Sequence, residues 1–226
     1  MQKDVETLSR GGSMLVEYKT AAGEAEATLI ERKSKFIARI RPLHTQDEAE
    51  AFIEAVRKEH WSATHNVPAY ILGMNQEIQK YSDDNEPSGT AGLPILEVLK
   101  ANEVVNVCVV VTRYFGGTLL GRGGLIRAYG GAARQALREA GIVRMVPAQK
   151  VAITVDYVHS GKIQNALLTQ GVALVDTEYL EQVTYHTLLF AHQKASLRQM
   201  IQEFTANDFA WTEGEEVHLS QGVDHD

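Results

Sequence analysis

The sequence predicts an α+β protein of two domains, and three patterns carry this prediction. In the first half, segments of alternating apolar and polar residues indicate strands, and segments with helical periodicity lie between them. The composition changes at Pro147, shortly after a helix that ends at Gly141. Beyond Pro147 the patterns follow the order β-α-β-β-α-β of a ferredoxin-like domain. We therefore expect one domain at 14–146 and a second at 147–226, joined by an exposed linker near 144–148.

The N-terminal segment and the single cysteine bear on where the protein works. Residues 1–13 are polar and lack periodicity, so we expect a non-native or disordered extension and a native start at Met14. The sequence shows no signal peptide pattern, and no apolar run reaches the roughly 20 residues of a membrane-spanning helix. Cys108 lies within a run of valines, where a buried and inert thiol is expected. These features predict a cytoplasmic protein without membrane association.

The first domain is expected to begin with strands and a capped helix. Alternation from Ala27 to Ile40 predicts one or two strands, with basic residues where they meet. Thr45 and Glu48 form a capping-box pair at the start of a helix. His65 to Gly73 predicts a strand near a sheet edge, because Pro68 has no N–H to donate.

The rest of the first domain contains the more unusual segments. Asn75 to Leu93 predicts a long polar loop, followed by a short helix with Pro94 in its first turn. The β-branched run from Val104 to Thr112 predicts a strand that is covered on both faces. A glycine-dense loop then opens a helix that extends to about Ala140.

The second domain is predicted from shorter patterns. Its expected strands are Lys150 to Tyr157, Ala173 to Leu180, Val183 to Phe190 and Phe209 to Val217, with helices around Lys162 to Gln170 and Leu197 to Phe204.

The net charge of −7 is divided unevenly between the domains. Residues 1–146 contain 18 basic and 18 acidic side chains, whereas residues 147–226 contain 4 and 11. The second domain therefore carries the whole acidic excess and would repel a phosphate backbone. Any contact with nucleic acid or another anion is expected in the first domain.

The glycine-dense loop is the first candidate binding site. Glycines permit close approach of a ligand, and the amides and positive dipole end of the following helix favour an anion. Guanidinium groups can grip a phosphate with two hydrogen bonds. Alternatively, the glycines only permit tight turns and the arginines are only solvated. The spacing matches neither the P-loop nor the dinucleotide fingerprint. The residues expected to bind are Arg113, Gly116, Gly117, Gly121, Arg122, Gly123, Gly124 and Arg127.

A second candidate is the acidic loop from Ser82 to Gly92. Asp83, Asp84 and Glu86 could hold a cation or supply a general base, with His65 joining them if its strand lies alongside. Such residues more often bond their own backbone and build a rigid turn, here with carboxylates free to pair an arginine of the glycine loop. The spacing matches neither a calcium loop nor a zinc site, so we expect no metal and no cofactor.

At this point the sequence resembles a bacterial member of the IMPACT family. The resemblance extends from about Glu17 to the C-terminus, and its long motifs make it specific. These motifs are Lys33 to Ile37, His65 to Tyr70, Tyr81 to Pro94, Val110 to Gly117 and Leu120 to Gly130.

The resemblance implies a fold for each domain and a theme for the function. It implies a first domain like ribosomal-protein domain 2 and a ferredoxin-like second domain similar to the last domain of elongation factor G. Eukaryotic relatives bind a ribosome-associated activator and restrain a kinase that controls translation initiation. They also carry an extra N-terminal recognition domain, which we do not expect in this chain. The theme of translational control is what transfers to this chain.

Three functional hypotheses follow. We expect a binding protein in translation control whose partner is RNA, the ribosome or a translation-associated protein, and which is not an enzyme. The alternative is an enzyme or a binder of a small phosphate-bearing ligand, using the glycine loop with His65, Asp83, Asp84 and Glu86. A third hypothesis, a purely protein-binding adaptor, needs no pocket.

Overall fold

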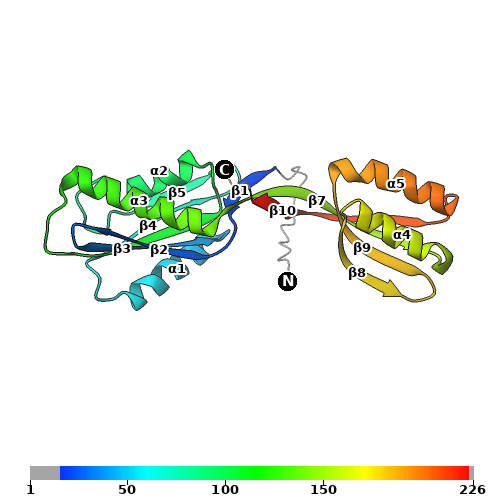
Figure 1. Cartoon of the computed structure of the whole chain (residues 1–226), viewed down its shortest axis with the longest axis horizontal. Coiled ribbons are helices and arrows are strands. Elements are labelled where there is room, and N and C mark those ends of the chain that lie inside the picture. The colour runs from blue at the N-terminus through cyan, green and yellow to red at the C-terminus, as the bar shows by residue number, and fades with distance from the viewer. Residues whose placement is uncertain (1–15, 224–226) are drawn as a thin grey trace. The chain divides into compact units, whose positions relative to one another are not determined.

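The computed structural model describes residues 16–223, so the predicted extension over 1–13 and the predicted start at Met14 lie outside the described residues. The described chain has a mixed α+β structure with two five-stranded sheets and five helices (Figure 1). It divides into two compact units, one containing residues 18–145 and the other residues 146–220.

The first unit is built around an antiparallel sheet with the strand order β2-β3-β6-β4-β5. Strand β6 lies at its centre, as expected for the β-branched run that forms it. The elements are β1 (Tyr18–Ala21), β2 (Ala25–Glu31), β3 (Ser34–Pro42), α1 (Gln46–Glu59), β4 (His65–Leu72), β5 (Ile78–Tyr81), α2 (Gly92–Ala101), β6 (Val107–Tyr114) and α3 (Gly121–Ala140).

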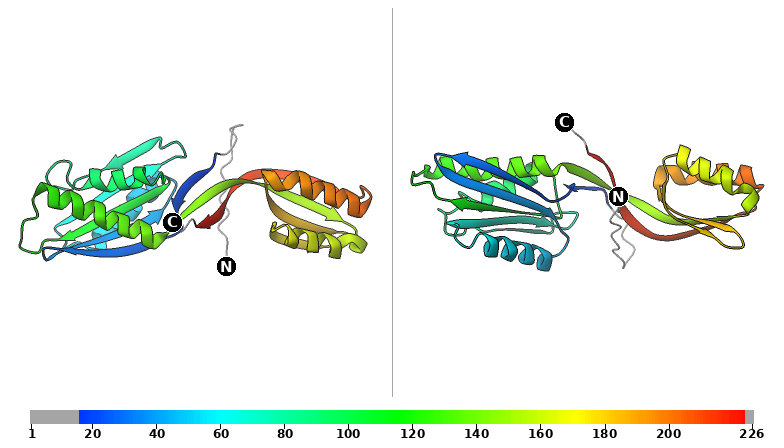
Figure 2. Two further views of the ribbon diagram at one scale, coloured as in Figure 1. Left: turned by 45° about the horizontal axis from the view of Figure 1, so that its top comes forward. Right: turned by 60° about the horizontal axis from the view of Figure 1, so that its bottom comes forward.

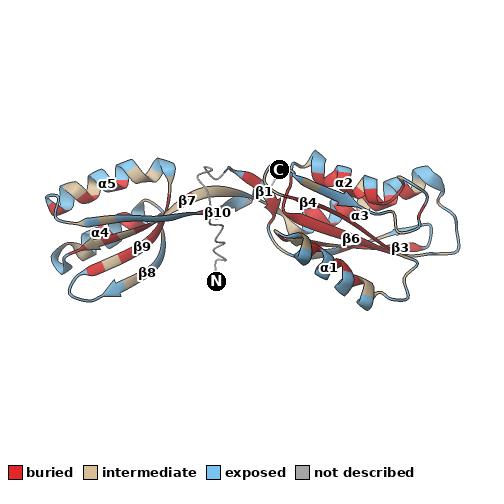
Figure 3. Cartoon of the chain, turned by 180° about the vertical axis from the view of Figure 1, so that it is seen from behind, coloured by how far each residue is buried: buried red, intermediate tan, exposed pale blue. Residues whose placement is uncertain are grey.

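Helices cover both faces of this sheet. Helices α2 and α3 lie on one face and α1 on the other (Figure 2, right). Successive side chains of a strand point to opposite faces. Val109 accordingly packs in the core that contains Tyr129 of α3, whereas Cys108 packs in the core that contains Phe52 of α1. Figure 3 shows the resulting buried strands between helices whose outer faces are exposed. The prediction of a strand covered on both faces is confirmed.

Two local features of this unit are a tight turn and a capped helix. Arg32 and Lys33 form the two-residue turn between β2 and β3, and both have positive φ, at 45° and 69°. This is the backbone of a type I′ hairpin turn. At α1, Thr45 accepts a hydrogen bond from the Glu48 amide, and the Glu48 carboxylate accepts from the Thr45 amide. The predicted capping box is therefore confirmed.

The region of β4 and β5 agrees with one prediction and differs from another. Strand β4 lies next to the sheet edge, as expected: β6 pairs with it from His65 to Ile71, whereas the edge strand β5 pairs only with Ala69 to Leu72. Pro68 is tolerated because its missing N–H faces the side of β5 just where the pairing ends, next to the Ala69–Tyr81 pair. By contrast, the expected loop from Asn75 to Leu93 contains a strand, β5. Four residues of mixed polarity give no alternation long enough to reveal this strand in the sequence.

The second unit has the expected element order: strand β7 (Ile142–Val155), helix α4 (Tyr157–Thr169), strands β8 (Ala173–Tyr179) and β9 (Val183–Phe190), helix α5 (Ala191–Thr205) and strand β10 (Ala210–Val223). Strand β7 pairs with β9 and with β10, and β8 extends the sheet beyond β9. Both helices lie on one face of the sheet (Figure 2). There Ile163 of α4 and Leu197 of α5 pack against Ile153 and Tyr185.

The boundary between the two units lies inside a continuous strand. The units divide between Met145 and Val146, and both residues belong to β7. The expected exposed linker near 144–148 is therefore wrong, and the strand predicted from Lys150 begins at Ile142. Residues 142–145 pair with β1, and residues 148–155 pair with β9. Pro147 lies between these two registers, where its missing N–H breaks neither ladder.

Two sequence predictions about single features have a direct structural counterpart. None of the described helices is long and apolar enough to cross a membrane. The thiol of Cys108 is fully buried at the centre of the first sheet, and this burial raises the pKa of the thiol well above its usual value. A buried thiol that stays protonated is unreactive, as expected.

Candidate functional site

The acidic loop between β5 and α2 is held together by its own carboxylates. Asp83 accepts hydrogen bonds from the amides of Gly89, Ala91 and Gly92, at 2.8, 3.1 and 2.9 Å. These bonds satisfy amides at the start of α2, which has no cap from its own N-cap residue. Asp83 is thus a structural residue that fixes the loop onto the helix.

Asp84 ties the same loop to the first residues of β4. Its carboxylate accepts from the Asn66 amide at 2.6 Å, and its carbonyl oxygen lies 2.7 Å from Nδ1 of His65. A carbonyl oxygen only accepts hydrogen bonds, so Nδ1 must carry a proton. In neutral His65 the lone pair is therefore on Nε2, which lies 3.6 Å from Oε1 of Glu86.

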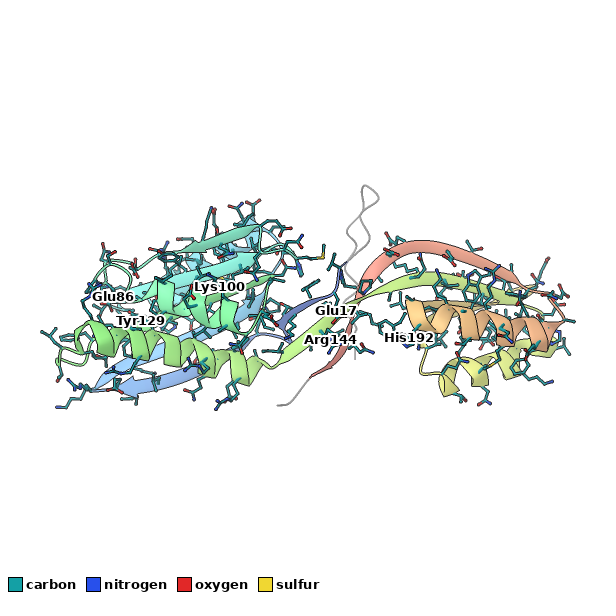
Figure 4. The ribbon with its side chains drawn as sticks, turned by 90° about the horizontal axis from the view of Figure 1, so that it is seen from above. Glu17, Glu86, Lys100, Tyr129, Arg144 and His192 are labelled. Atoms are coloured by element: carbon teal, nitrogen blue, oxygen red, sulfur yellow. The ribbon has the colours of Figure 1, made fainter. Side chains whose placement is uncertain are left out.

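Glu86 is the centre of a buried polar cluster. Its Oε1 accepts from Arg113 at 2.6 Å and from the Tyr129 hydroxyl at 2.7 Å. Glu86 comes from the loop and Tyr129 from α3 (Figure 4). Arg113 comes from the end of β6. Burial, followed by the bond to Glu86, raises the pKa of Tyr129 far above its usual value, so its hydroxyl remains a donor. The loop carboxylate and the glycine-loop arginine thus form the ion pair that the structural interpretation of the acidic loop anticipated.

Arg113 is enclosed as well as paired. Only 5% of the residue is exposed, and its guanidinium carbon lies 5.4 Å from the Phe36 ring centroid and 5.5 Å from that of Phe115. Its Nε is buried without a hydrogen-bond partner among the described residues. Arg113 therefore acts by holding Glu86, and its charge is compensated inside the domain.

The glycine loop packs against the β2–β3 hairpin before it opens α3. A Cβ on Gly116 would lie 2.0 Å from the carbonyl carbon of Lys33, so only glycine fits there. The amide of Gly116 donates to Oγ of Ser34 at 3.1 Å. At the start of α3, Gly121 has φ of +71°, and no side chain of the N-cap residue caps the helix. The first amides of α3 therefore have no capping oxygen from Leu120.

A pocket of about 470 Å³ lies where these segments meet. Five of the predicted site residues line it, while Asp83 and Asp84 shape the loop behind it and Gly116, Gly117, Gly123, Gly124 and Arg127 lie outside its lining. The predicted residues in the lining are His65, Glu86, Arg113, Gly121 and Arg122.

The remaining lining residues were not predicted as site residues. Phe115 stands within the glycine loop itself, so its position was the available signal. Thr64, Pro87, Leu119, Leu120 and Leu125 carry no pattern that would single them out. Over residues 16–223, no three His, Cys, Asp or Glu side chains converge as a metal site.

Arg122 differs from Arg113 in being exposed. Within residues 16–223 its side chain makes one hydrogen bond, from Nη2 to the Ser88 carbonyl at 2.9 Å. Arg127, one and a half turns further along α3, is also exposed, and neither residue has a carboxylate partner in the described chain. The first turns of α3 therefore carry positive charge that the described part of the domain does not neutralise.

These features define an α+β protein of two domains, with a pocket where its glycine loop meets its acidic loop. Comparison with known proteins makes this class specific. Residues 32–137 match the model of the Impact N-terminal domain, and residues 153–207 match a domain of unknown function (DUF1949).

The similarity to individual proteins extends over most of the chain. This chain is 40% identical to the IMPACT family member YvyE of Bacillus subtilis over 212 residues, which cover 94% of this chain and 98% of YvyE. It is 35% identical to the IMPACT family member YigZ of Escherichia coli over 185 residues, which cover 80% of this chain and 91% of YigZ. A solved structure titled as that of a hypothetical protein aligns with a TM-score of 0.57 at 30% identity, covering 89% of this chain and 99% of the other. The chain belongs to the IMPACT family.

Proposed function

We propose that this protein is a cytoplasmic binding protein in translation control, and that its first domain contacts RNA at the rim of the glycine-loop pocket. The observation that carries the proposal is the exposed, unneutralised charge of Arg122 and Arg127 beside the uncapped start of α3. Amides at a helix start and guanidinium groups are the donors that bind phosphates. The acidic second domain has the opposite charge and plays no part in this contact.

The proposal includes the fold relationships that the family resemblance implies. The first domain would share the fold of ribosomal-protein domain 2, and the second would be ferredoxin-like, as in the last domain of elongation factor G. Both are folds of the translation apparatus, which is why we place the protein there.

The test is an RNA-binding titration at several salt concentrations, using the full chain. Each phosphate contact to single-stranded RNA adds about −0.7 to the slope of log affinity against log salt. Replacing Arg122 and Arg127 with alanine should therefore flatten the slope by about 1.4. Arg113 is left unchanged, because its loss would leave Glu86 buried without its cation.

The matched control removes two positive charges from the second domain. Lys162 and Arg198 are exposed on α4 and α5, so their double alanine variant changes the net charge equally. It should leave the slope unchanged. Equal slopes for the wild type and the Arg122–Arg127 variant would refute the proposed RNA contact, and absence of binding by the wild type would favour the protein-adaptor hypothesis.

A second function, binding or conversion of a small phosphate-bearing ligand, is favoured by one observation. The bond to the Asp84 carbonyl fixes His65 so that Nε2 is the proton-accepting atom beside the pocket. A histidine held in this way can serve as a general base. Native mass spectrometry of the purified protein should then detect a bound phosphate ester that is lost in His65→Gln; a spectrum of the unliganded mass alone speaks against this function.

A further inference from the structure

The hairpin turn between β2 and β3 and the glycine loop form one continuous surface. The Gly116 amide donates to Oγ of Ser34, directly after the turn, and the backbones of Gly116 and Lys33 are in contact. In the sheet, Lys35 pairs with Tyr114, the last residue before the loop. The basic turn therefore adjoins the loop that leads to Arg122.

The cations of this surface are not neutralised by the domain. Arg32, Lys33 and Lys35 are exposed and have no ion-pair partner among residues 16–223. By contrast, other cations of the same domain are paired: Lys19 with Glu103, Arg39 with Glu26 and Glu59, Arg41 with Glu24, Arg57 with Glu54 and Lys100 with Glu97. The exposed acidic side chain next to the turn is Glu31, so three cations stand against one carboxylate there.

Two aromatic side chains are exposed on segments that lie at the same end of the sheet. Trp61 lies in the turn after α1, and 83% of it is exposed, while Phe115 in the glycine loop is 47% exposed. The two segments are bonded together: the Phe115 amide donates to Oγ1 of Thr64 at 3.1 Å, and the Thr64 amide donates to the Arg113 carbonyl at 2.9 Å. Trp61 is therefore a surface residue with no core role, on a segment whose next residues are bonded to the glycine loop.

Unneutralised cations interleaved with exposed aromatic rings are the recognition chemistry of single-stranded nucleic acid. The cations follow the backbone, and bases stack on the rings. In a duplex the bases are stacked on one another, so exposed rings would find no partner. The exposed rings therefore favour a single strand over a double helix.

We propose that single-stranded RNA crosses this surface, with its phosphates at Arg32, Lys33, Lys35 and Arg122 and its bases stacked on Trp61 and Phe115. This inference rests on the proposed RNA-binding function. It specifies single-stranded RNA and extends the binding site from α3 to the hairpin turn and two aromatic residues.

The test measures fluorescence anisotropy of a labelled single-stranded RNA of about ten nucleotides, a length within the range of single-strand binding sites. Trp61→Ala and Phe115→Ala should each weaken binding by about five- to a hundredfold, the loss expected from removing one stacked base. The salt slope should stay unchanged, because stacking releases no counterions. Tyr179→Ala, which removes a similarly exposed aromatic residue from β8, serves as the control and should bind as the wild type does.

The charge of the turn is tested without straining the turn. Arg32→Asn with Lys33→Gly removes both cations and supplies the pair that a type I′ turn favours. This variant should fold at least as well as the wild type, yet flatten the salt slope by about 1.4. The Lys162–Arg198 alanine variant is its charge-matched control.

The outcomes separate this inference from the function on which it rests. If the aromatic and turn variants bind as the wild type does, or if duplex RNA of the same length binds as tightly, the single-strand inference is wrong. Dependence on Arg122 and Arg127 would then still support the proposed function. If the wild-type protein binds neither form of RNA, both proposals fail.

Discussion

The buried cluster around Glu86 decides which loop residues can meet a ligand. Its carboxylate accepts hydrogen bonds from Arg113 and Tyr129 inside the domain. Arg113, which is expected from the sequence to bind a phosphate, therefore holds the loop in place instead. Desolvating an ion pair costs free energy that the pair only partly recovers, whereas removing one partner leaves an uncompensated buried charge. The two glycine-loop arginines therefore have different roles, and substituting them should give different results.

We predict that Arg113→Ala lowers the free energy of unfolding by about 3–5 kcal/mol. The triple variant Glu86→Leu, Arg113→Met and Tyr129→Phe should be much closer to the wild type, because no buried polar group is left unpaired. Arg122→Ala should change stability by less than about 0.5 kcal/mol, as is usual for an exposed side chain. Urea denaturation followed by circular dichroism measures all three. Wild-type stability in Arg113→Ala would show that the pair contributes nothing to the fold.

Among the secondary-structure elements, α1 has a capping box whose contribution to stability can be measured. The Glu48 carboxylate accepts from the amides of His44 and Thr45, at 2.7 and 3.1 Å. The hydrogen bond from the His44 amide has the largest effect and lowers the pKa of Glu48. Burial opposes it and the bond from the Thr45 amide adds to it, so that the pKa lies below its usual value. The folded pKa is thus depressed, so the carboxylate stabilises the fold above the unfolded pKa of about 4.3. This stabilisation is lost as the pH falls through the folded pKa.

We therefore predict that Glu48→Gln destabilises the protein at about pH 7, and that this effect shrinks as the pH falls from there through the folded pKa, because the wild-type carboxyl then becomes protonated as well. Asp47→Asn removes the same charge from the same helical turn, and Asp47 has no hydrogen bond to an amide among the described residues. Its effect should be smaller throughout this pH range. Chemical denaturation of the three proteins across this range provides the measurement, and a Glu48→Gln deficit that persists undiminished in acid would contradict the capping mechanism.

The same scale shows what a single sequence can and cannot predict. The capping box, the helix end at Gly141 and the strand β6 were predictable, because each depends on residues close together in the chain. Strand β5 and the neighbours of β4 were not, since strand pairing joins residues far apart. For the same reason both candidate loops were recognisable, but the burial of Arg113 and the exposed position of Trp61 emerge only once β3, β4 and β6 are aligned.

At the scale of the whole chain, the change in composition at Pro147 predicted where the two units meet. It did not predict that the chain at this boundary is part of a strand. A break in composition commonly signals a flexible linker, and linkers are where proteases cut. Here the chain passes from one unit to the other within β7, whose residues are paired with β1 before Pro147 and with β9 after it. A protease needs a stretch of unpaired backbone, and β7 offers little of it.

We accordingly predict that limited digestion with chymotrypsin cuts first at exposed aromatic residues and leucines in loops and turns, and not within residues 142–150. Leu119, in the glycine loop, is 81% exposed, and Leu180, in the turn between β8 and β9, is 75% exposed. Neither lies in a strand ladder, whereas the backbone around Met145 is paired. Mass spectrometry of the earliest fragments identifies the sites, and Leu119→Gly should delay the first of these cuts without moving it into β7. Early fragments that end between 142 and 150 would show instead that this part of the strand opens readily, and the two units would then be joined by a linker after all.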